Sequence, residues 1–147
     1  PLAEAAVSEV AERMFPHCYV CGQENARGLR VAFAPHPGGG CRAEYVAREE
    51  HVGWPEVIHG GLLFTLMDEA VAWAVIYAGL HGVTARAEAR FREPVRVGTP
   101  LVVRGWLVDP PRRVTRARAE LRAGSEEGPL VAELDALMAI TKDTTIA

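Results

Sequence analysis

The sequence is poor in lysine. Its basic residues are fifteen arginines and a single lysine, Lys142, and 19 acidic residues leave a net charge of −3. This charge gives the chain no general electrostatic attraction for nucleic acids or for anionic membranes. We therefore expect neither a nucleic-acid-binding protein nor a protein of the membrane surface.

Cysteine is also scarce. Cys18, Cys21 and Cys41 are too few, and odd in number, for a disulfide scaffold. The first residues also lack the basic start, apolar run and small-residue cleavage site of a secretory signal. From both observations we expect reduced cysteines and a cytoplasmic protein.

Neither repeats, low-complexity tracts nor linkers divide the chain. Its 147 residues match one ordinary domain, which can bury about two-thirds of its unfolded surface. A composition of 49% hydrophobic and 24% charged residues is typical of a globular protein. We expect a single domain over residues 1–147, with an N-terminal arm and turn-rich segment at 1–28 and a core at 29–140. Residues 1–14 fit a short amphipathic helix or a mobile arm.

Six segments bounded by turn residues predict β-strands, and most of them alternate apolar with polar residues. These segments are 29–33, 41–45, 83–91, 101–108, 114–122 and 130–140. Between the second and the third, residues 60–78 are apolar on nearly every side, which predicts a long surrounded helix. Short turns favour antiparallel neighbours. We therefore expect an α+β fold, in which an antiparallel sheet of about six strands curls around one central helix.

The alternation is clearest in the third segment. Its apolar residues are expected to share one face of the sheet: Val83, Ala85, Ala87, Ala89 and Phe91. The polar residues between them, which begin with Thr84, are expected on the opposite face. This one-sided pattern indicates a sheet that is covered on one face only.

Residues 62–80 are long enough to span a bilayer. Asp68 and Glu69 lie near the midpoint of this stretch, where an acidic residue costs about 2.5–3.5 kcal/mol on insertion scales. The sequence shows no second span that could pair with them. We therefore expect a buried core helix here.

The predicted helix starts in an unusual way, with His59, Gly60 and Gly61 and without the Ser, Thr, Asp or Asn that usually caps a helix. A helix leaves its first four N–H groups without internal partners, and its dipole adds partial positive charge there. Glycines would let a carbonyl approach these N–H groups closely, which suggests an oxyanion site. A tight turn into the helix, or close packing, explains the glycines equally well.

Asp68 and Glu69 are the only charges between His59 and His81. Glu69 could reach solvent as an ordinary surface group. Asp68 shares a side of the helix with Thr65, which could orient it. An acid in this position is a candidate general base or nucleophile, and the alternative is a structural carboxylate with satisfied hydrogen bonds.

The spacing of these groups has a consequence for assembly. Gly60 and Asp68 are separated by about 12 Å along the helix, at about 1.5 Å per residue. A single thioester or ester carbonyl cannot contact both groups of one chain. If the two groups cooperate, one of them comes from a neighbouring subunit, so the spacing predicts a dimer.

Three segments carry a family resemblance: "HGGLLFTLMDEA" at 59–70, "GVTARAEARFREPVRVGTPL" at 82–101 and "CYVCGQENARGL" at 18–29. Through them, and over roughly residues 18–140, the chain resembles the hotdog-fold acyl-CoA thioesterases of the phenylacetate-pathway type. That branch also includes the mammalian thioesterase superfamily members. The resemblance implies a sheet wrapped around a central helix, paired into dimers and often tetramers, with active sites at the dimer interface.

Carried over by position, the resemblance implies four catalytic residues. The Gly60 amide would bind the thioester oxygen, and Asp68 of the facing subunit would attack the carbonyl or activate water. His59 would support the site, and Thr84 would orient the nucleophilic water. Further substrate contacts are expected from Gly61, His51, Asn25 and Glu69.

Two of these residues carry an alternative. Some relatives have an asparagine six residues before the histidine, where this chain has Gly53, and His51 is the candidate to replace it. Asn25 either lines the pocket or only shapes its own turn.

The remaining polar residues leave further alternatives open. "HCYVC" at 17–21 has the cysteine spacing of half a zinc site, and Cys41 and His36 would have to complete it. A reduced turn is the expected interpretation, so we predict no metal. The arginines of 86–92 and 112–122 are expected on the solvated sheet face, where some could bind coenzyme A phosphates.

We therefore predict a cofactor-independent thioesterase that hydrolyses acyl-CoA to free acid and coenzyme A. Its predicted partners are the acyl-CoA substrate and further copies of the chain, in a homodimer or a dimer of dimers. One alternative is a hotdog hydratase, dehydratase or related lyase, which usually carries a different arrangement of His with Asp or Glu. The other is a non-catalytic acyl-CoA-binding protein.

Overall fold

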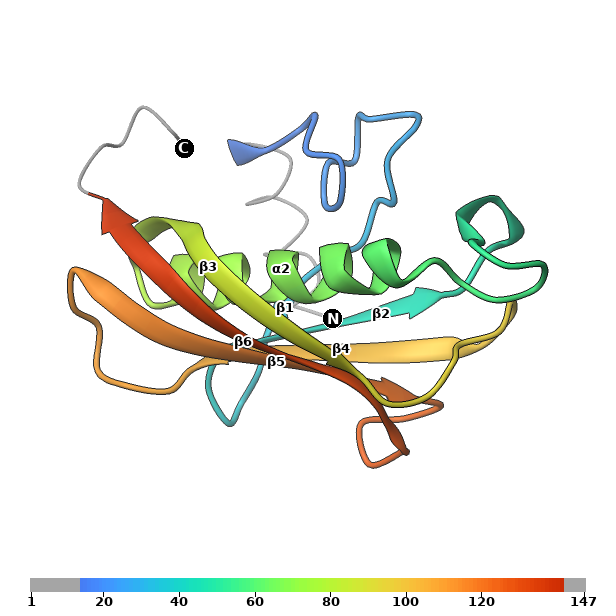
Figure 1. Cartoon of the computed structure of the whole chain (residues 1–147). Helices are drawn as coiled ribbons and strands as arrows, with labels where there is room; N and C mark the ends of the chain where they lie inside the picture. The colour runs from blue at the N-terminus through green and yellow to red at the C-terminus, as the bar shows by residue number, and fades with distance from the viewer. Residues whose placement is uncertain (1–13, 142–147) are drawn as a thin grey trace.

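The computed structural model describes residues 14–141, which form one curved sheet and one long helix (Figure 1). In chain order the elements are β1 (Ala34–Pro35), β2 (Cys41–Val46), the 3-10 helix η1 (Glu49–His51), α2 (Gly60–Tyr77), β3 (His81–Phe91), β4 (Pro100–Leu107), β5 (Val114–Ala123) and β6 (Leu130–Thr141). The helix or arm predicted for residues 1–14 lies, except for its last residue, outside the described part of the chain. The division of residues 1–147 into an arm and a core stays a prediction.

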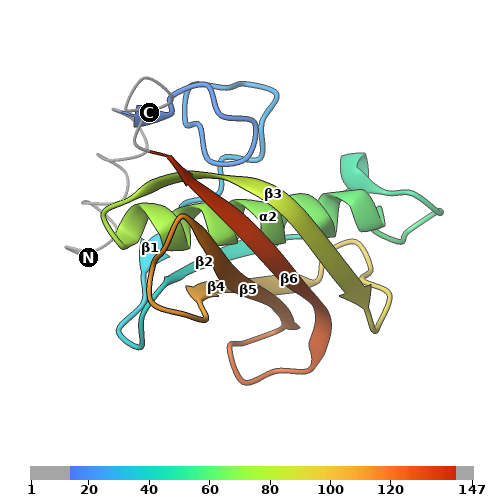
Figure 2. The ribbon, with the colours of Figure 1, turned by 60° about the vertical axis from the view of Figure 1, so that its left-hand side comes forward.

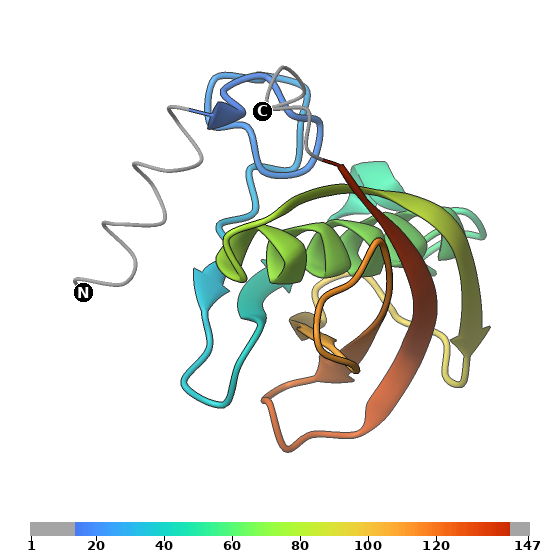
Figure 3. The ribbon, with the colours of Figure 1, turned by 90° about the vertical axis from the view of Figure 1, so that its left-hand side faces the viewer.

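The six strands are hydrogen-bonded in the order β1-β2-β4-β5-β6-β3, and every neighbouring pair is antiparallel. Turned views show the sheet curving around α2, from β1 and β2 on one side of the helix to β6 and β3 on the other (Figures 2 and 3). This arrangement confirms the predicted α+β architecture. β1 and β3 form the two edges of the sheet, and α2 leads directly into β3.

α2 is the core of the fold. Its buried residues lie on several sides of the helix: Leu62, Leu63, Leu66, Met67, Ala70, Val71, Trp73, Ala74 and Val75. By length and composition α2 could cross a membrane, but half of its residues are buried inside the fold. It is therefore the core helix expected from the two mid-helix acids.

The helix lies directly on β4. Gly105 makes this approach possible, because a Cβ atom on it would lie 2.5 Å from the Ala70 carbonyl oxygen. The Cys41 thiol on β2 donates a hydrogen bond to the same carbonyl at 3.0 Å. On β5, Ala117 and Ala119 are small and fully buried, on the face that their alternation predicted. Small side chains thus bring the sheet close to the helix backbone.

β3 corrects one prediction. Its pairing with β6 shifts between Thr84 and Arg86, so Ala85 is the extra residue of a β-bulge. Upstream of the bulge the two faces of the strand are exchanged: Val83 is 45% exposed, whereas Thr84 is half-buried and hydrogen-bonded to α2. The single apolar face predicted for this strand is therefore wrong before the bulge. After it, Ala87 and Ala89 pack against the core as predicted, whereas Phe91 is 50% exposed.

The segment 29–33, which was predicted as a strand of the sheet, also differs from the prediction. Leu29 and Val31 are buried, whereas Arg30 and Ala32 are exposed, as the alternation indicates. Their N–H groups, however, donate to the carbonyls of Tyr19 and Val20, so this stretch pairs with the turn-rich segment before it. Only the short β1 hydrogen-bonds to β2, and with it forms the predicted hairpin.

The central position of α2 can be tested at Leu66, which is fully buried. Leu66→Ala is expected to lower the free energy of unfolding by about 2–5 kcal/mol, because a cavity adds to the lost hydrophobic burial. Urea denaturation followed by circular dichroism measures this change. The control is Val46→Ala on β2, where the side chain is 56% exposed. This substitution should lower the free energy of unfolding by less than about 1 kcal/mol. Equal losses for the two variants would contradict the assignment of α2 as the core helix.

Candidate active site

A histidine side chain caps the start of α2. His59 Nδ1 accepts a hydrogen bond from the Gly61 N–H at 2.9 Å, and the His59 carbonyl accepts one from the Leu62 N–H. The expectation that the helix lacks a capping side chain is therefore wrong, because a ring nitrogen replaces the usual side-chain oxygen. Since Nδ1 is the acceptor, neutral His59 carries its ring proton on Nε2.

The two glycines at the helix start have different explanations. A Cβ atom on Gly61 would lie 2.9 Å from His59 Nδ1, so Gly61 makes room for the cap. A Cβ atom on Gly60 would meet only the Phe91 ring, at an ordinary 3.7 Å, and Gly60 has no positive φ. A tight turn or close packing therefore explains Gly61, but nothing within residues 14–141 requires glycine at position 60.

The Gly60 N–H is a free hydrogen-bond donor. No acceptor within the described chain lies in hydrogen-bond reach of it. Gly60 borders an open hollow of about 530 Å³, lined by Gly53, Trp54, Ile58, His59 and Gly60 itself. It also borders a smaller hollow of about 220 Å³ next to Phe91. A free N–H at a helix N-terminus, open to such space, suits a carbonyl oxygen that develops negative charge.

His51 is fixed beside the helix start. Its carbonyl accepts a hydrogen bond from the His59 N–H at 2.9 Å, and its Nδ1 is bonded to the Tyr45 hydroxyl. Burial lowers the pKa of His51 and raises the pKa of Tyr45, which favours a neutral ring that accepts a hydrogen bond from the neutral hydroxyl. Tyr45 was not among the predicted site residues, because its alternation on β2 marks it only as a core residue. The predicted contact of His51 with substrate stays a prediction.

Asp68 is held by Thr84 across the contact between α2 and β3. Thr84 Oγ1 donates a hydrogen bond to Asp68 Oδ1 at 2.8 Å, and the bulge at Ala85 is what turns Thr84 inward. Thr65 does not orient Asp68, contrary to expectation, because its hydroxyl donates to the Gly61 carbonyl at 2.8 Å. No donor in the described chain is bonded to Asp68 Oδ2, and the side chain is only half-buried. Oδ2 is therefore available to act on water or substrate.

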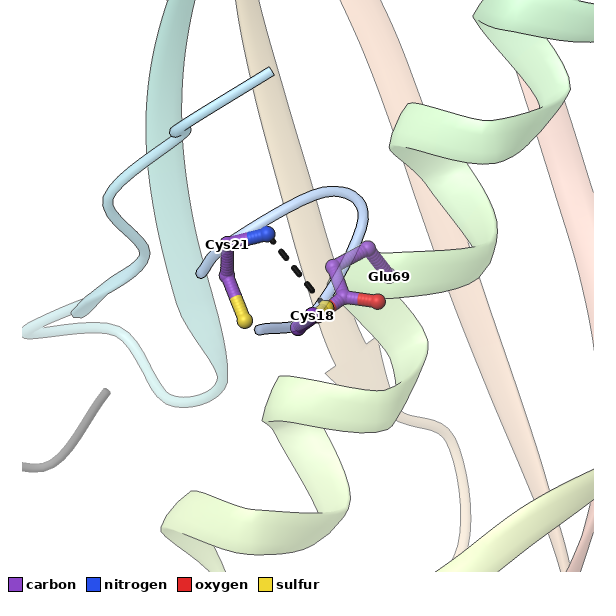
Figure 4. A group of neighbouring side chains, drawn as sticks. All are labelled: Cys18, Cys21 and Glu69. Atoms are coloured by element: carbon purple, nitrogen blue, oxygen red, sulfur yellow. Dashed lines mark hydrogen bonds between the residues drawn. The ribbon is translucent and has the colours of Figure 1, made fainter. Parts of the chain in front are cut away.

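Glu69 points to another side of α2, towards the turn-rich segment (Figure 4). Cys18 Sγ and Glu69 Oε1 are 3.4 Å apart and share a hydrogen bond, so Glu69 is not the ordinary surface group that it could have been. Burial raises the pKa of Glu69 to about 7. Hydrogen bonding with the Cys21 side chain lowers the pKa of the Cys18 thiol to about 5, and the same bond raises the pKa of Cys21. The predicted contact of Glu69 with substrate stays a prediction.

Asn25 shapes its own turn, which is one of its two predicted roles. Its Nδ2 donates to the His17 carbonyl at 3.2 Å, and its Oδ1 accepts from the Arg27 N–H at 3.0 Å. Both bonds close the loop that precedes Leu29. A contact with substrate stays a prediction for this residue too.

The two residues named to complete a zinc site lie elsewhere. The Cys41 thiol is in the core on the Ala70 carbonyl, and His36 is paired with Glu126 at the turn between β1 and β2. That ligand set is therefore not assembled. All three cysteines are free thiols in the structure, and the reduced state expected from the sequence stays a prediction.

The sequence of this chain matches the profile of the thioesterase superfamily over residues 56–129, which is half of its length. The chain belongs to the thioesterase superfamily. The matched region contains the helix start, Asp68 and Thr84, and the fold is the hotdog fold that the resemblance implied. Membership makes this a thioesterase-type protein. No curated protein sequence matches the chain.

Solved structures share the fold. A thioesterase superfamily protein is 25% identical with a TM-score of 0.78 over 84% of this chain, which spans only 60% of that protein. A variant of the phenylacetic acid degradation protein PaaI from Thermus thermophilus is 26% identical, with a TM-score of 0.67, over 76% of this chain and 93% of that one. A hypothetical thioesterase from Streptococcus pneumoniae, solved with coenzyme A, is 22% identical, with a TM-score of 0.69, over 76% of this chain and 85% of that one.

The cap at the helix start gives a prediction on stability. His59→Ala is expected to lower the free energy of unfolding by about 0.5–2 kcal/mol, because the Gly61 N–H loses its acceptor. His59→Asn supplies another capping oxygen and should stay within about 0.5 kcal/mol of the original protein. Thermal and urea denaturation of the three proteins measure the difference. Unchanged stability in His59→Ala would show that the ring does not cap the helix.

Proposed function

We propose that the protein is a cofactor-independent thioesterase that hydrolyses acyl-CoA to a free acid and coenzyme A. The hydrogen bond from Thr84 to Asp68 carries this proposal, because it fixes a carboxylate whose second oxygen is unoccupied. Family membership supports a thioester as the bond that is broken. The presence of coenzyme A in the Streptococcus pneumoniae neighbour supports acyl-CoA as the substrate class. The cytoplasm, which holds acyl-CoA, is the proposed location.

In the proposed reaction, the thioester oxygen binds at the start of α2. The Gly60 N–H donates to this oxygen, and the helix dipole favours the negative charge that it develops. Loss of one such donor in other hydrolases costs about 2.7–4 kcal/mol of transition-state stabilisation. The free state of this N–H in the subunit supports its role as the oxyanion donor.

Asp68 acts as the general base. Its Oδ2 accepts a proton from a water molecule while the water oxygen bonds to the thioester carbon. Thr84 holds Oδ1 and so fixes the direction of Oδ2. The tetrahedral intermediate then collapses as the carbon–sulfur bond breaks, and the proton passes from Asp68 to the sulfur. The products are the free acid and coenzyme A, with Asp68 restored.

The two groups belong to different subunits in this proposal, because Gly60 and Asp68 of one helix are about 12 Å apart. β3 is an edge strand with a row of unpaired N–H and C=O groups. Thr84 lies near its start, and Phe91, at its end, lies next to Gly60. Antiparallel pairing of β3 with a second copy would bring the start of one strand beside the end of the other. Asp68 would then face the partner's Gly60.

Exposed apolar residues on β3 support the same pairing. Val83 and Phe91 are 45% and 50% exposed, one near each end of the strand. A second copy paired along this edge would contact the strand at both ends, because a twofold axis presents the same surface on each subunit. We propose this homodimer as the catalytic unit, and a dimer of dimers as the larger assembly.

Replacement of Asp68 tests the mechanism. Asp68→Asn is expected to lower kcat by roughly 10²–10⁴-fold, because the general base is lost. Release of free thiol from a panel of acyl-CoAs measures the rate. Thr84→Val should also lower kcat, whereas Thr84→Ser keeps the hydroxyl and should retain most activity. Full activity in Asp68→Asn would contradict the mechanism. Hydration of enoyl-CoA without thiol release would indicate a lyase. Tight binding of acyl-CoA without turnover would indicate a binding protein.

A mixture of two inactive variants tests the shared site. Asp68→Asn removes the base, and Gly60→Leu blocks the approach of the thioester to the helix start. Random assembly gives about half mixed dimers, in which one of the two sites keeps both residues, so about a quarter of the original activity should return. Native mass spectrometry establishes that mixed dimers have formed. No recovery in their presence would place both groups in the same subunit.

A further inference from the structure

We propose that Cys18, Cys21 and Glu69 bind a thiophilic divalent metal ion, for which zinc is the best match. The two sulfur atoms and a carboxylate oxygen of Glu69 all lie within 4.8 Å of one another. Figure 4 shows the cysteines on one turn, beside the Glu69 side chain that comes from α2. This ligand set differs from the one considered on sequence grounds, because the third ligand is a carboxylate from the core helix.

The distances fit a tetrahedral zinc site. With zinc–sulfur bonds of about 2.3 Å and zinc–oxygen bonds of about 2.0–2.2 Å, neighbouring ligand atoms are about 3.5–3.8 Å apart. Cys18 Sγ and Glu69 Oε1 are separated by 3.4 Å. Only small side-chain movements are therefore needed to take up an ion.

The turn that carries the cysteines is built for this geometry. The Gly22 N–H donates to the Cys18 carbonyl at 2.9 Å, and the Cys21 N–H donates to Cys18 Sγ at 3.4 Å. A Cβ atom on Gly22 would lie 2.5 Å from the Cys18 nitrogen, so only glycine fits this close turn. The turn holds both sulfurs on one side, and an N–H directed at sulfur stabilises a metal-bound thiolate.

Glu69 otherwise has no explanation in the fold. A carboxylate buried in a protein is normally paired with a cation or bound to a metal. Within residues 14–141 its oxygen contacts the Cys18 side chain, and Glu69 takes part in none of the ion pairs. It is also separate from the proposed catalytic group, because Asp68 is bonded to Thr84 on another side of α2. A metal ion would supply the positive charge that this carboxylate lacks.

The proposed ion fastens the turn-rich segment to the middle of the core helix. Three protein ligands leave the fourth tetrahedral position to a water molecule. Two thiolates and one carboxylate around a divalent ion carry one net negative charge, so uptake of the ion releases the protons that the metal-free cluster holds. The site is separate from the proposed thioesterase reaction, because Asp68 is bonded to Thr84 on another side of α2.

Metal binding by the full-length protein tests the proposal. We expect the reduced, metal-free chain to take up one Zn²⁺ that survives dialysis, to unfold at a higher temperature with it, and to give a thiolate-to-metal charge-transfer band with Co²⁺. Cys18→Ser, Cys21→Ser and Glu69→Gln should each weaken binding by more than the roughly 10–100-fold typical of an outer-shell change. Cys41→Ser, which changes the one cysteine outside the cluster, should bind as the original protein does.

Three results would overturn the proposal. The first is a reduced wild-type chain that gives no Co²⁺–thiolate band. The second is an unchanged affinity in folded Cys18→Ser or Glu69→Gln, with folding checked by circular dichroism. The third is a disulfide between Cys18 and Cys21 as the stable state, with no zinc bound after its reduction. The first result needs no variant, so the test does not depend on whether the substituted proteins fold.

Discussion

The packing of α2 inside the curved sheet is the constraint on which the rest of the structure depends. The helix is too apolar to face water, and half of its residues are buried by the sheet around it. At Gly105 and Ala70 the backbones of β4 and α2 nearly touch, because the glycine has no side chain to separate them. A helix held this closely cannot rotate or slide without clashes. Each polar group on it therefore has a fixed direction.

The fixed helix separates three kinds of chemistry. Successive residues of an α-helix are turned by about 100°, so neighbouring acids meet different surroundings. Asp68 meets Thr84 on β3, whereas Glu69 meets Cys18 on the turn-rich segment. The first turn, with the free Gly60 N–H, opens to a hollow instead. One rigid helix thus carries the proposed base, the proposed metal ligand and the proposed oxyanion donor. None of the three is hydrogen-bonded to another.

Most of the fold could be predicted from the sequence, because it follows from short-range patterns. The helix expected at 60–78 is Gly60–Tyr77, and the last three strands lie where alternation and turn residues put them. The faces of β3 could not be predicted, because a bulge depends on how the strand registers with β6, far away in the chain. The same bulge decides that Thr84 reaches Asp68. Alternation with a period of two assumes that every residue of the strand is paired, so it cannot predict a bulge residue that has no partner.

The residues of the candidate site could be predicted better than the contacts between them. The resemblance picked out Asp68 and Thr84, and the structure adds the hydrogen bond between them. The surroundings of Glu69 were missed because its neighbour Cys18 is 51 residues away in the chain. The cap was missed because histidine is an unusual capping residue, and only the geometry at Gly61 identifies it. Such contacts depend on tertiary packing, about which local composition says little.

Gly60 remains the residue that a single chain explains least. Glycine within a helix costs up to about 1 kcal/mol relative to alanine, and at Gly61 that cost is offset by the His59 cap. At Gly60 neither the backbone nor a neighbouring side chain excludes a Cβ atom. The reason for this glycine therefore lies outside the described subunit. A substrate carbonyl seated on the Gly60 N–H meets this condition, and a second subunit with its Asp68 beside that carbonyl also covers the open edge of β3.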